Sequence, residues 1–152
     1  MMTWVTEQRE IICRYINHEP MESRKMKLRV LIADADTVLL TAYRAYLIDG
    51  IDTCTVTTGL ECLEKLRRWQ PDILVLNTDL LWGSGLGVLA VMQDDPAIPI
   101  VPVLLLSDRP NALADQTIPV RDFTVIIKPV SPFVLASILF TLADSGWGDR
   151  HK

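Results

Sequence analysis

The sequence predicts an α/β domain in which a parallel five-stranded sheet lies between two layers of helices. Two observations lead to this prediction. From residue 28 onward, short apolar runs alternate with segments of helical periodicity, as expected for strands joined by crossover helices. Several of these runs lack polar alternation, which indicates strands that are buried on both faces. Because such crossovers are right-handed and five units are present, we expect a flavodoxin-like three-layer sandwich.

The first half of this domain is predicted to contain three strands and two helices. Their expected order is a strand at 28–33, a helix at 37–48, a strand at 53–57, a helix from 59 and a strand at 73–76. Asp36 stands immediately before the first helix, where its carboxylate can cap free N–H groups. Thr58 and Glu61 have the spacing of a capping box, which marks the start of the second helix.

The second half is predicted to contain two strands and three helices. Their expected order is a helix opened by Ser84, a strand at 100–106, a short helix at 112–116, a strand at 123–127 and a helix from 132. Ser131 and Pro132 give the last helix an N-cap and a proline at its first position. The short helix is poorly patterned and is the weakest of these predictions.

The composition excludes several classes of protein. A net charge of −4 and a pI near 5.1 offer no basic surface, so we expect no binding to nucleic acid. No apolar run is long enough to cross a bilayer, so we expect no membrane insertion. Cys13, Cys54 and Cys62 contain no C-x-x-C pair and are odd in number, which favours a reducing, cytoplasmic location over a disulfide framework.

Three parts are expected along the chain. Residues 1–26 are predicted to be a helical extension and linker, residues 27–143 the α/β domain, and residues 144–152 a C-terminal tail. In the extension, apolar residues between 4 and 16 share one helical face, which we expect to pack on its own domain, on a second copy or on a partner.

Four polar residues stand at or just beyond the ends of predicted strands. These are Asp34, Asn77, Ser107 and Lys128. Open parallel sheets bind their ligands at the carboxyl ends of the strands. These four residues are therefore the candidate functional site.

Around these positions the sequence resembles the receiver domains of bacterial response regulators. The matching segments are Val30 to Asp36, Pro71 to Asn77 followed by Gly83 to Leu86, Val103 to Ser107, and Ile126 to Pro129. Each match alone is weak, but four in this order are specific, and together they cover roughly residues 27 to 143. The resemblance implies the CheY-like form of the flavodoxin-like fold and a role in two-component, phosphorelay signal transduction.

The resemblance also implies a chemistry that this sequence does not complete. In a full receiver, two adjacent acids and an acceptor aspartate hold a divalent cation, and the acceptor takes a phosphoryl group. Here Asn77 stands at the acceptor position and Ala35 replaces the second acid. Val125 stands where the family usually has an aromatic switch residue, while Phe123 is nearby but out of step.

The remaining site residues take their expected roles from the same resemblance. They are Asp34 and Asp36 as a vestigial acidic pocket, Ser107 as the switch hydroxyl and Lys128 as the pocket lysine. We expect no catalytic residue and no acyl phosphate on Asn77. Binding of Mg²⁺ should be weak or absent, with Asp34 as a weak candidate ligand, because two of three carboxylates are missing. Asp34 is instead expected to pair with Lys128.

These expectations favour a degenerate receiver, or pseudo-receiver, that acts as a phosphorylation-independent interaction module and not as an enzyme. Its partner would be a protein: a histidine kinase, another regulator or a second copy. One alternative is a phosphorelay receiver with a displaced acceptor, for which Asp79 and Asp108 are the candidates. The other is a small flavodoxin-like enzyme or nucleotide binder, although no Gly-rich phosphate loop follows the first strand.

Trp82 is the remaining residue of note, because a large ring stands in the loop where the family has small residues or proline. Packing of the ring over the pocket is the expected role. A contact residue for a partner is the alternative.

Overall fold

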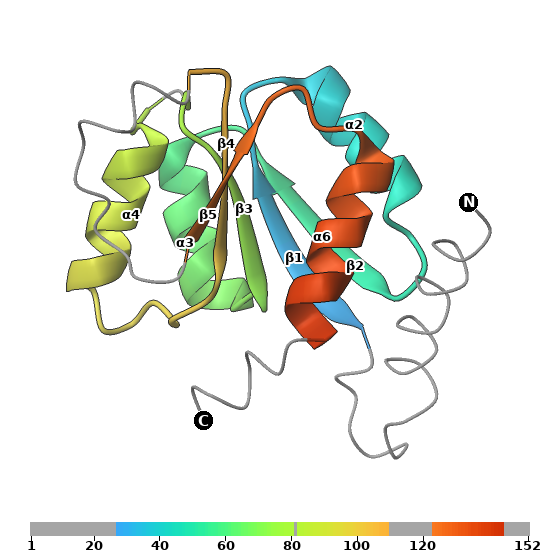
Figure 1. The fold of residues 1–152 in the computed structure, drawn as a ribbon. Coiled ribbons are helices and arrows are strands. Elements are labelled where there is room, and N and C mark those ends of the chain that lie inside the picture. Colours follow the sequence, from blue (N-terminus) through green and yellow to red (C-terminus); the bar gives the residue numbers. More distant parts are fainter. Residues whose placement is uncertain (1–26, 81, 110–122, 145–152) are drawn as a thin grey trace, which may run out of the picture.

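The computed structural model describes residues 27–80, 82–109 and 123–144, and these residues form one parallel sheet with helices on both faces (Figure 1). The five strands have the order β2-β1-β3-β4-β5, and all four neighbouring pairs are parallel. This architecture confirms the predicted α/β, flavodoxin-like sandwich. The elements are β1 (Leu28–Ala33), α2 (Thr37–Tyr46), β2 (Ile51–Val56), α3 (Gly59–Trp69), β3 (Ile73–Asn77), α4 (Gly85–Asp94), β4 (Val103–Ser107), β5 (Phe123–Ile127) and α6 (Pro132–Asp144).

The strands at 28–33 and 123–127 occur at the predicted residues, and the other three strands differ from the prediction at one or both ends. β2 begins at Ile51 and not at residue 53, because Ile51 already pairs with Leu28 in the parallel register. β4 begins at Val103 and not at residue 100, since Pro102 has no N–H to donate to the sheet. The extension at 1–26, the helix expected at 112–116 and the tail from 145 lie outside the described residues.

Two apolar clusters form the core, one on each face of the sheet. Helices α2 and α6 cover one face and α3 and α4 cover the other (Figure 1). Neighbouring residues along a strand point to opposite faces, so Val30 belongs to the first cluster and Leu31 to the second. The central strands β1, β3 and β4 are therefore buried on both sides, as predicted from their unbroken apolar runs.

The same prediction is wrong for β5, which lies at the edge of the sheet. Phe123, Val125 and Ile127 alternate along one side of this strand, and 37%, 36% and 59% of their surfaces are exposed. Only Ile126 packs against a core cluster. An apolar sequence run predicts a strand, but its burial depends on the neighbours it finds.

The predicted helix starts are confirmed by their caps. The Asp36 carboxylate accepts hydrogen bonds from the N–H groups of Val38 and Leu39, both at 3.1 Å. The Thr58 hydroxyl accepts from the N–H of Glu61 at 3.2 Å, and it donates to the Glu61 carboxylate at 3.1 Å. These caps fix where α2 and α3 begin, directly beside the carboxyl ends of the strands. In the part of the chain described here, no helix is long and apolar enough to span a membrane.

Candidate functional site

The candidate residues gather at the carboxyl edge of the central strands. Asp34 follows β1, Asn77 and Ser107 end β3 and β4, and Lys128 follows β5. Asp34, Asn77 and Ser107 are 1%, 5% and 2% exposed, and they are the buried polar residues in the described part of the chain. Burying polar groups costs free energy unless each finds a partner. The contacts of each group therefore define what the site can do.

Asn77 bonds directly to Asp34. The β1–β3 register pairs Ala33 with Leu76, so the two residues that follow lie opposite each other. The Asn77 amide nitrogen donates to Asp34 Oδ1 at 3.1 Å, and the N–H of Asp36 donates to the same oxygen at 2.9 Å. The Asn77 amide oxygen accepts from the N–H of Asp79 at 3.2 Å. Both ends of the amide are thus used within the protein.

Lys128 supplies the positive charge beside Asp34. Its Nζ lies 3.4 Å from Asp34 Oδ2, with 24% of the Lys128 side chain exposed. The contact is an ion pair without hydrogen-bond geometry, because Oδ2 has no hydrogen-bond partner among the described residues. Removal of the lysine would leave a buried, uncompensated carboxylate, which is strongly unfavourable.

The side chains of Ser107 and Asp36 make their hydrogen bonds outside the Asp34–Lys128 ion pair. The Ser107 hydroxyl accepts from the N–H of Arg109 at 3.1 Å, and its carbonyl accepts from the N–H of Lys128 at 2.9 Å. Asp36 was expected both as the helix cap and in the acidic pocket. Its exposed carboxylate bonds the first turn of α2, as expected for the cap, while its N–H donates to Asp34 Oδ1. A carboxylate that caps a helix gains from the helix dipole there, and this explains its position.

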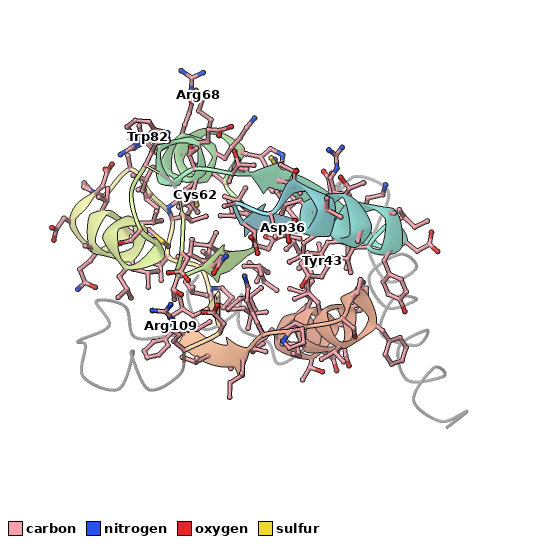
Figure 2. The ribbon with its side chains drawn as sticks, turned by 90° about the horizontal axis from the view of Figure 1, so that it is seen from above. Asp36, Tyr43, Cys62, Arg68, Trp82 and Arg109 are labelled. Carbon is pink, nitrogen blue, oxygen red and sulfur yellow. The ribbon has the colours of Figure 1, made fainter. Side chains whose placement is uncertain are left out.

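Tyr43 also contributes to the site, although the sequence analysis did not identify it as a site residue. Its hydroxyl donates to the carbonyl of Val130 at 2.7 Å, and the ring lies between α2 and α6 (Figure 2). Burial of the ring raises the Tyr43 pKa to about 12, with smaller contributions from the negative charges of Asp34 and Asp36. This bond ties α2 to the segment that follows Lys128. A buried tyrosine usually needs a hydrogen-bond partner for its hydroxyl, and this rule alone could have indicated from the sequence that Tyr43 has a structural role.

Gly85 is the second residue that sequence reasoning missed. A Cβ at this position would lie 2.5 Å from the carbonyl oxygen of Asn77 and 2.8 Å from the Cα of Thr78. The N–H of Gly85 also donates to the Thr78 carbonyl at 3.0 Å. The start of α4 can therefore close against the end of β3 only with glycine, and this close approach fixes the backbone that carries Asn77.

The prediction that Trp82 packs over the pocket is wrong. The side chain is 75% exposed, and its backbone has a φ of 54°, in the left-handed region. Figure 2 shows Trp82 beside α3, at the outside of the molecule and away from Asp36 and Tyr43. The other tryptophan in the described residues, Trp69, is partly buried and stacks with the Arg29 guanidinium 4.4 Å from its ring centre.

Comparison with known proteins places these observations in one family of folds. No protein-family model matches the chain. A probable transcriptional regulator from Porphyridium aerugineum, ycf27, is 26% identical over 107 residues, which are 70% of this chain and 44% of that protein. The regulatory protein LuxO from Vibrio cholerae is 34% identical over 97 residues, 62% of this chain and 21% of that protein. The chain thus spans about half of the first of these curated relatives, and less of the second.

Solved receiver domains match over nearly their whole length. A signal receiver domain from Vibrio parahaemolyticus is 25% identical with a TM-score of 0.57, and the match covers 80% of this chain and 98% of that one. A CheY-like response regulator receiver domain protein from Methanospirillum hungatei is 20% identical with a TM-score of 0.65, covering 81% of this chain and 98% of that one. These matches confirm the predicted fold and the resemblance to response-regulator receivers.

Proposed function

We propose that this chain, a receiver domain by its fold and its relatives, works as a protein-interaction module that does not depend on phosphorylation of its own. One observation carries the proposal: an amide, Asn77, ends β3 where the resemblance places the phosphoryl acceptor. A carboxylate oxygen can attack phosphorus, whereas the amide nitrogen of Asn77 is engaged as a donor to Asp34. An acyl phosphate at this residue is therefore not expected, and we infer a non-enzymatic, regulatory role.

The contacts of Asp34 also argue against a divalent cation in this pocket. Mg²⁺ needs several oxygen ligands in a tight octahedron. Asp34 Oδ1 already accepts two N–H groups, and Oδ2 faces the positive Lys128. Ala35 has no oxygen in its side chain, and Asn77 turns its nitrogen toward Asp34. No group of three or more His, Cys, Asp or Glu residues in the described ranges is arranged to hold a metal ion. We propose that Mg²⁺ binding is weak or absent.

The partner we propose is a protein, as for receiver domains of two-component systems. A histidine kinase, another regulator and a second copy of this chain all remain within the proposal. The acidic net charge of −4 favours a protein over nucleic acid. A displaced acceptor is the rival hypothesis, and the exposed residues Asp79 and Asp108 are its candidates.

Phosphodonor labelling tests the proposal. The full chain is incubated with Mg²⁺ and acetyl phosphate or phosphoramidate, and intact mass is measured at neutral pH. We expect no phosphoryl adduct. A stoichiometric, base-labile adduct would overturn the proposal, and repeating the labelling with Asp79→Asn and Asp108→Asn would then locate the displaced acceptor. The variant carrying both Ala35→Asp and Asn77→Asp serves as the matched positive control.

A further inference from the structure

We propose that Leu60 and Trp82 form a docking surface for a partner-protein segment that carries a basic side chain beside an apolar one. The inference rests on the proposed function, because it gives the interaction module a surface and a class of partner. Leu60 and Trp82, together called the Leu60–Trp82 patch below, are 67% and 75% exposed. They come from α3 and from the loop between β3 and α4.

The backbone brings these two segments together at a close approach. A Cβ on Gly59 would lie 2.7 Å from the Trp82 carbonyl oxygen and 2.6 Å from that of Gly83. The loop therefore rests on the first turn of α3, one residue before Leu60, and only glycine at position 59 allows this. Figure 2 shows Trp82 beside this helix. The two exposed apolar residues thus belong to neighbouring segments on one part of the surface.

The conformation of Trp82 indicates that its exposure is not an incidental result of folding. A non-glycine residue with a φ of 54° is held in an unfavourable backbone region. A buried ring could offset this cost by packing, but the Trp82 side chain is largely in water. Strained residues of this kind concentrate at functional sites. Tryptophan is also among the residue types most enriched at the energetic hot spots of protein interfaces.

The charges near the patch determine the kind of partner. Glu61 follows Leu60 on α3, and Asp79 lies in the same loop as Trp82; both are exposed. Neither carboxylate forms an ion pair in the described part of the chain, whereas Arg68 on the same helix is paired with Glu64. Glu61 keeps its negative charge although its Oε1 accepts hydrogen bonds from the hydroxyls of Thr57 and Thr58. An indole face attracts Arg or Lys, and nearby carboxylates strengthen that attraction. A basic and apolar segment is therefore the complementary ligand.

Peptide display on the unphosphorylated full chain tests this inference. Random dodecamer peptides on phage are selected against the immobilised protein, and the recovered peptides are labelled with fluorescein for anisotropy titrations. We expect enrichment of Arg or Lys next to Leu or an aromatic residue. Trp82→Ala and Leu60→Ala should each weaken binding at least tenfold, and Asp79→Asn should weaken it several-fold. Ile100→Ala is the matched control, since Ile100 is 74% exposed and precedes β4, whereas the patch lies beyond the end of β3.

Each other outcome overturns the inference. Peptides without basic residues would exclude the proposed chemistry, and equal binding by wild type and Trp82→Ala would exclude the surface. The inference is also overturned if no peptide is enriched although thermal melting shows that the immobilised protein is folded. A dimer of the wild type that Trp82→Ala dissociates in sedimentation would assign the patch to a second copy. No phosphodonor is present, so these results are independent of the labelling experiment that tests the proposed function.

Discussion

The pocket at the carboxyl edge of the sheet buries and pairs its polar side chains, whereas the loop beside it exposes a large apolar one. In the pocket, the charge of Asp34 is balanced by Lys128, and Asn77 uses both ends of its amide within the protein. In the loop, Trp82 leaves most of its indole in water on a strained backbone. The pocket balances its charge internally, although Asp34 Oδ2 accepts no hydrogen bond among the described residues, while most of the Trp82 ring contacts only water. From this contrast we infer that the proposed binding function lies on the rim, meaning the loop that carries Trp82, and not in the pocket.

Removing Lys128 should have the largest effect on the pocket side of this comparison. Lys128→Met leaves the Asp34 carboxylate buried and unpaired, and we expect a loss of about 3 kcal/mol in the free energy of unfolding. Urea denaturation measures it. The double variant with Asp34→Asn should recover most of the loss, because the uncompensated charge is gone. Lys65→Met, at an exposed lysine of α3, is the matched control and should change little. Equal stability of Lys128→Met and wild type would show that the pair is not structural.

The Asn77 amide should be the next most sensitive part of the pocket. Asn77→Asp places a second carboxylate next to Asp34, where the amide nitrogen now stands 3.1 Å from Oδ1. Like-charge repulsion should lower the free energy of unfolding by about 2 kcal/mol without Mg²⁺.

Calorimetric titration then separates the role of Ala35 from that of Asn77. The double change Ala35→Asp with Asn77→Asp should bind Mg²⁺ at least tenfold more tightly than Asn77→Asp alone, since it adds the missing ligand. Equal affinities would mean that Ala35 does not occupy a metal-ligand position.

The pocket and the rim also differ in how well the sequence predicted their structure. Unbroken apolar runs placed β1, β3 and β4, and the polar residues at their ends pointed to one edge of the sheet. These features are local in sequence, because the spacing of apolar residues and the capping of helices depend on residues a few positions apart. The exposure of β5 and the orientation of Trp82 depend on neighbours that are distant in the chain, so local patterns did not predict them.

The two site residues that were missed have the same explanation. Tyr43 bonds the carbonyl of Val130, 87 positions away in sequence, and nothing near Tyr43 in the chain identifies that partner. Gly85 contacts the backbone of Asn77, and a glycine in a loop gives no sign of whether it serves a turn or a close approach. The composition of a site can thus be read from strand ends, whereas the residues that hold it in place require the packed structure.

Tyr43 offers a pH test of the packing that supports the pocket. Its pKa is raised from 10.0 to about 12 by burial, so the neutral phenol is favoured in the folded protein. The resulting stabilisation is fully present below the unfolded pKa of 10.0 and is lost as pH rises through the folded pKa of about 12. Urea denaturation at pH 8 and at pH 11.5 should therefore show a smaller loss of stability for Tyr43→Phe than for wild type. The same loss in both proteins would mean that other groups govern alkaline unfolding.

The smallest expected effect lies on the rim, and it separates strain from packing at Trp82. Glycine adopts a φ of 54° freely, so Trp82→Gly removes backbone strain worth about 1 to 2 kcal/mol. The greater freedom of glycine in the unfolded chain offsets about 0.5 to 1 kcal/mol of this gain. We therefore expect the free energy of unfolding to rise by about 0 to 1.5 kcal/mol, as measured by urea denaturation. Gly83→Ala, where φ is 99°, is the control and should be destabilising. If Trp82→Gly instead destabilised the fold clearly, the ring would be packing on its own domain, and the distinction between a charge-balanced pocket and an exposed loop would be lost.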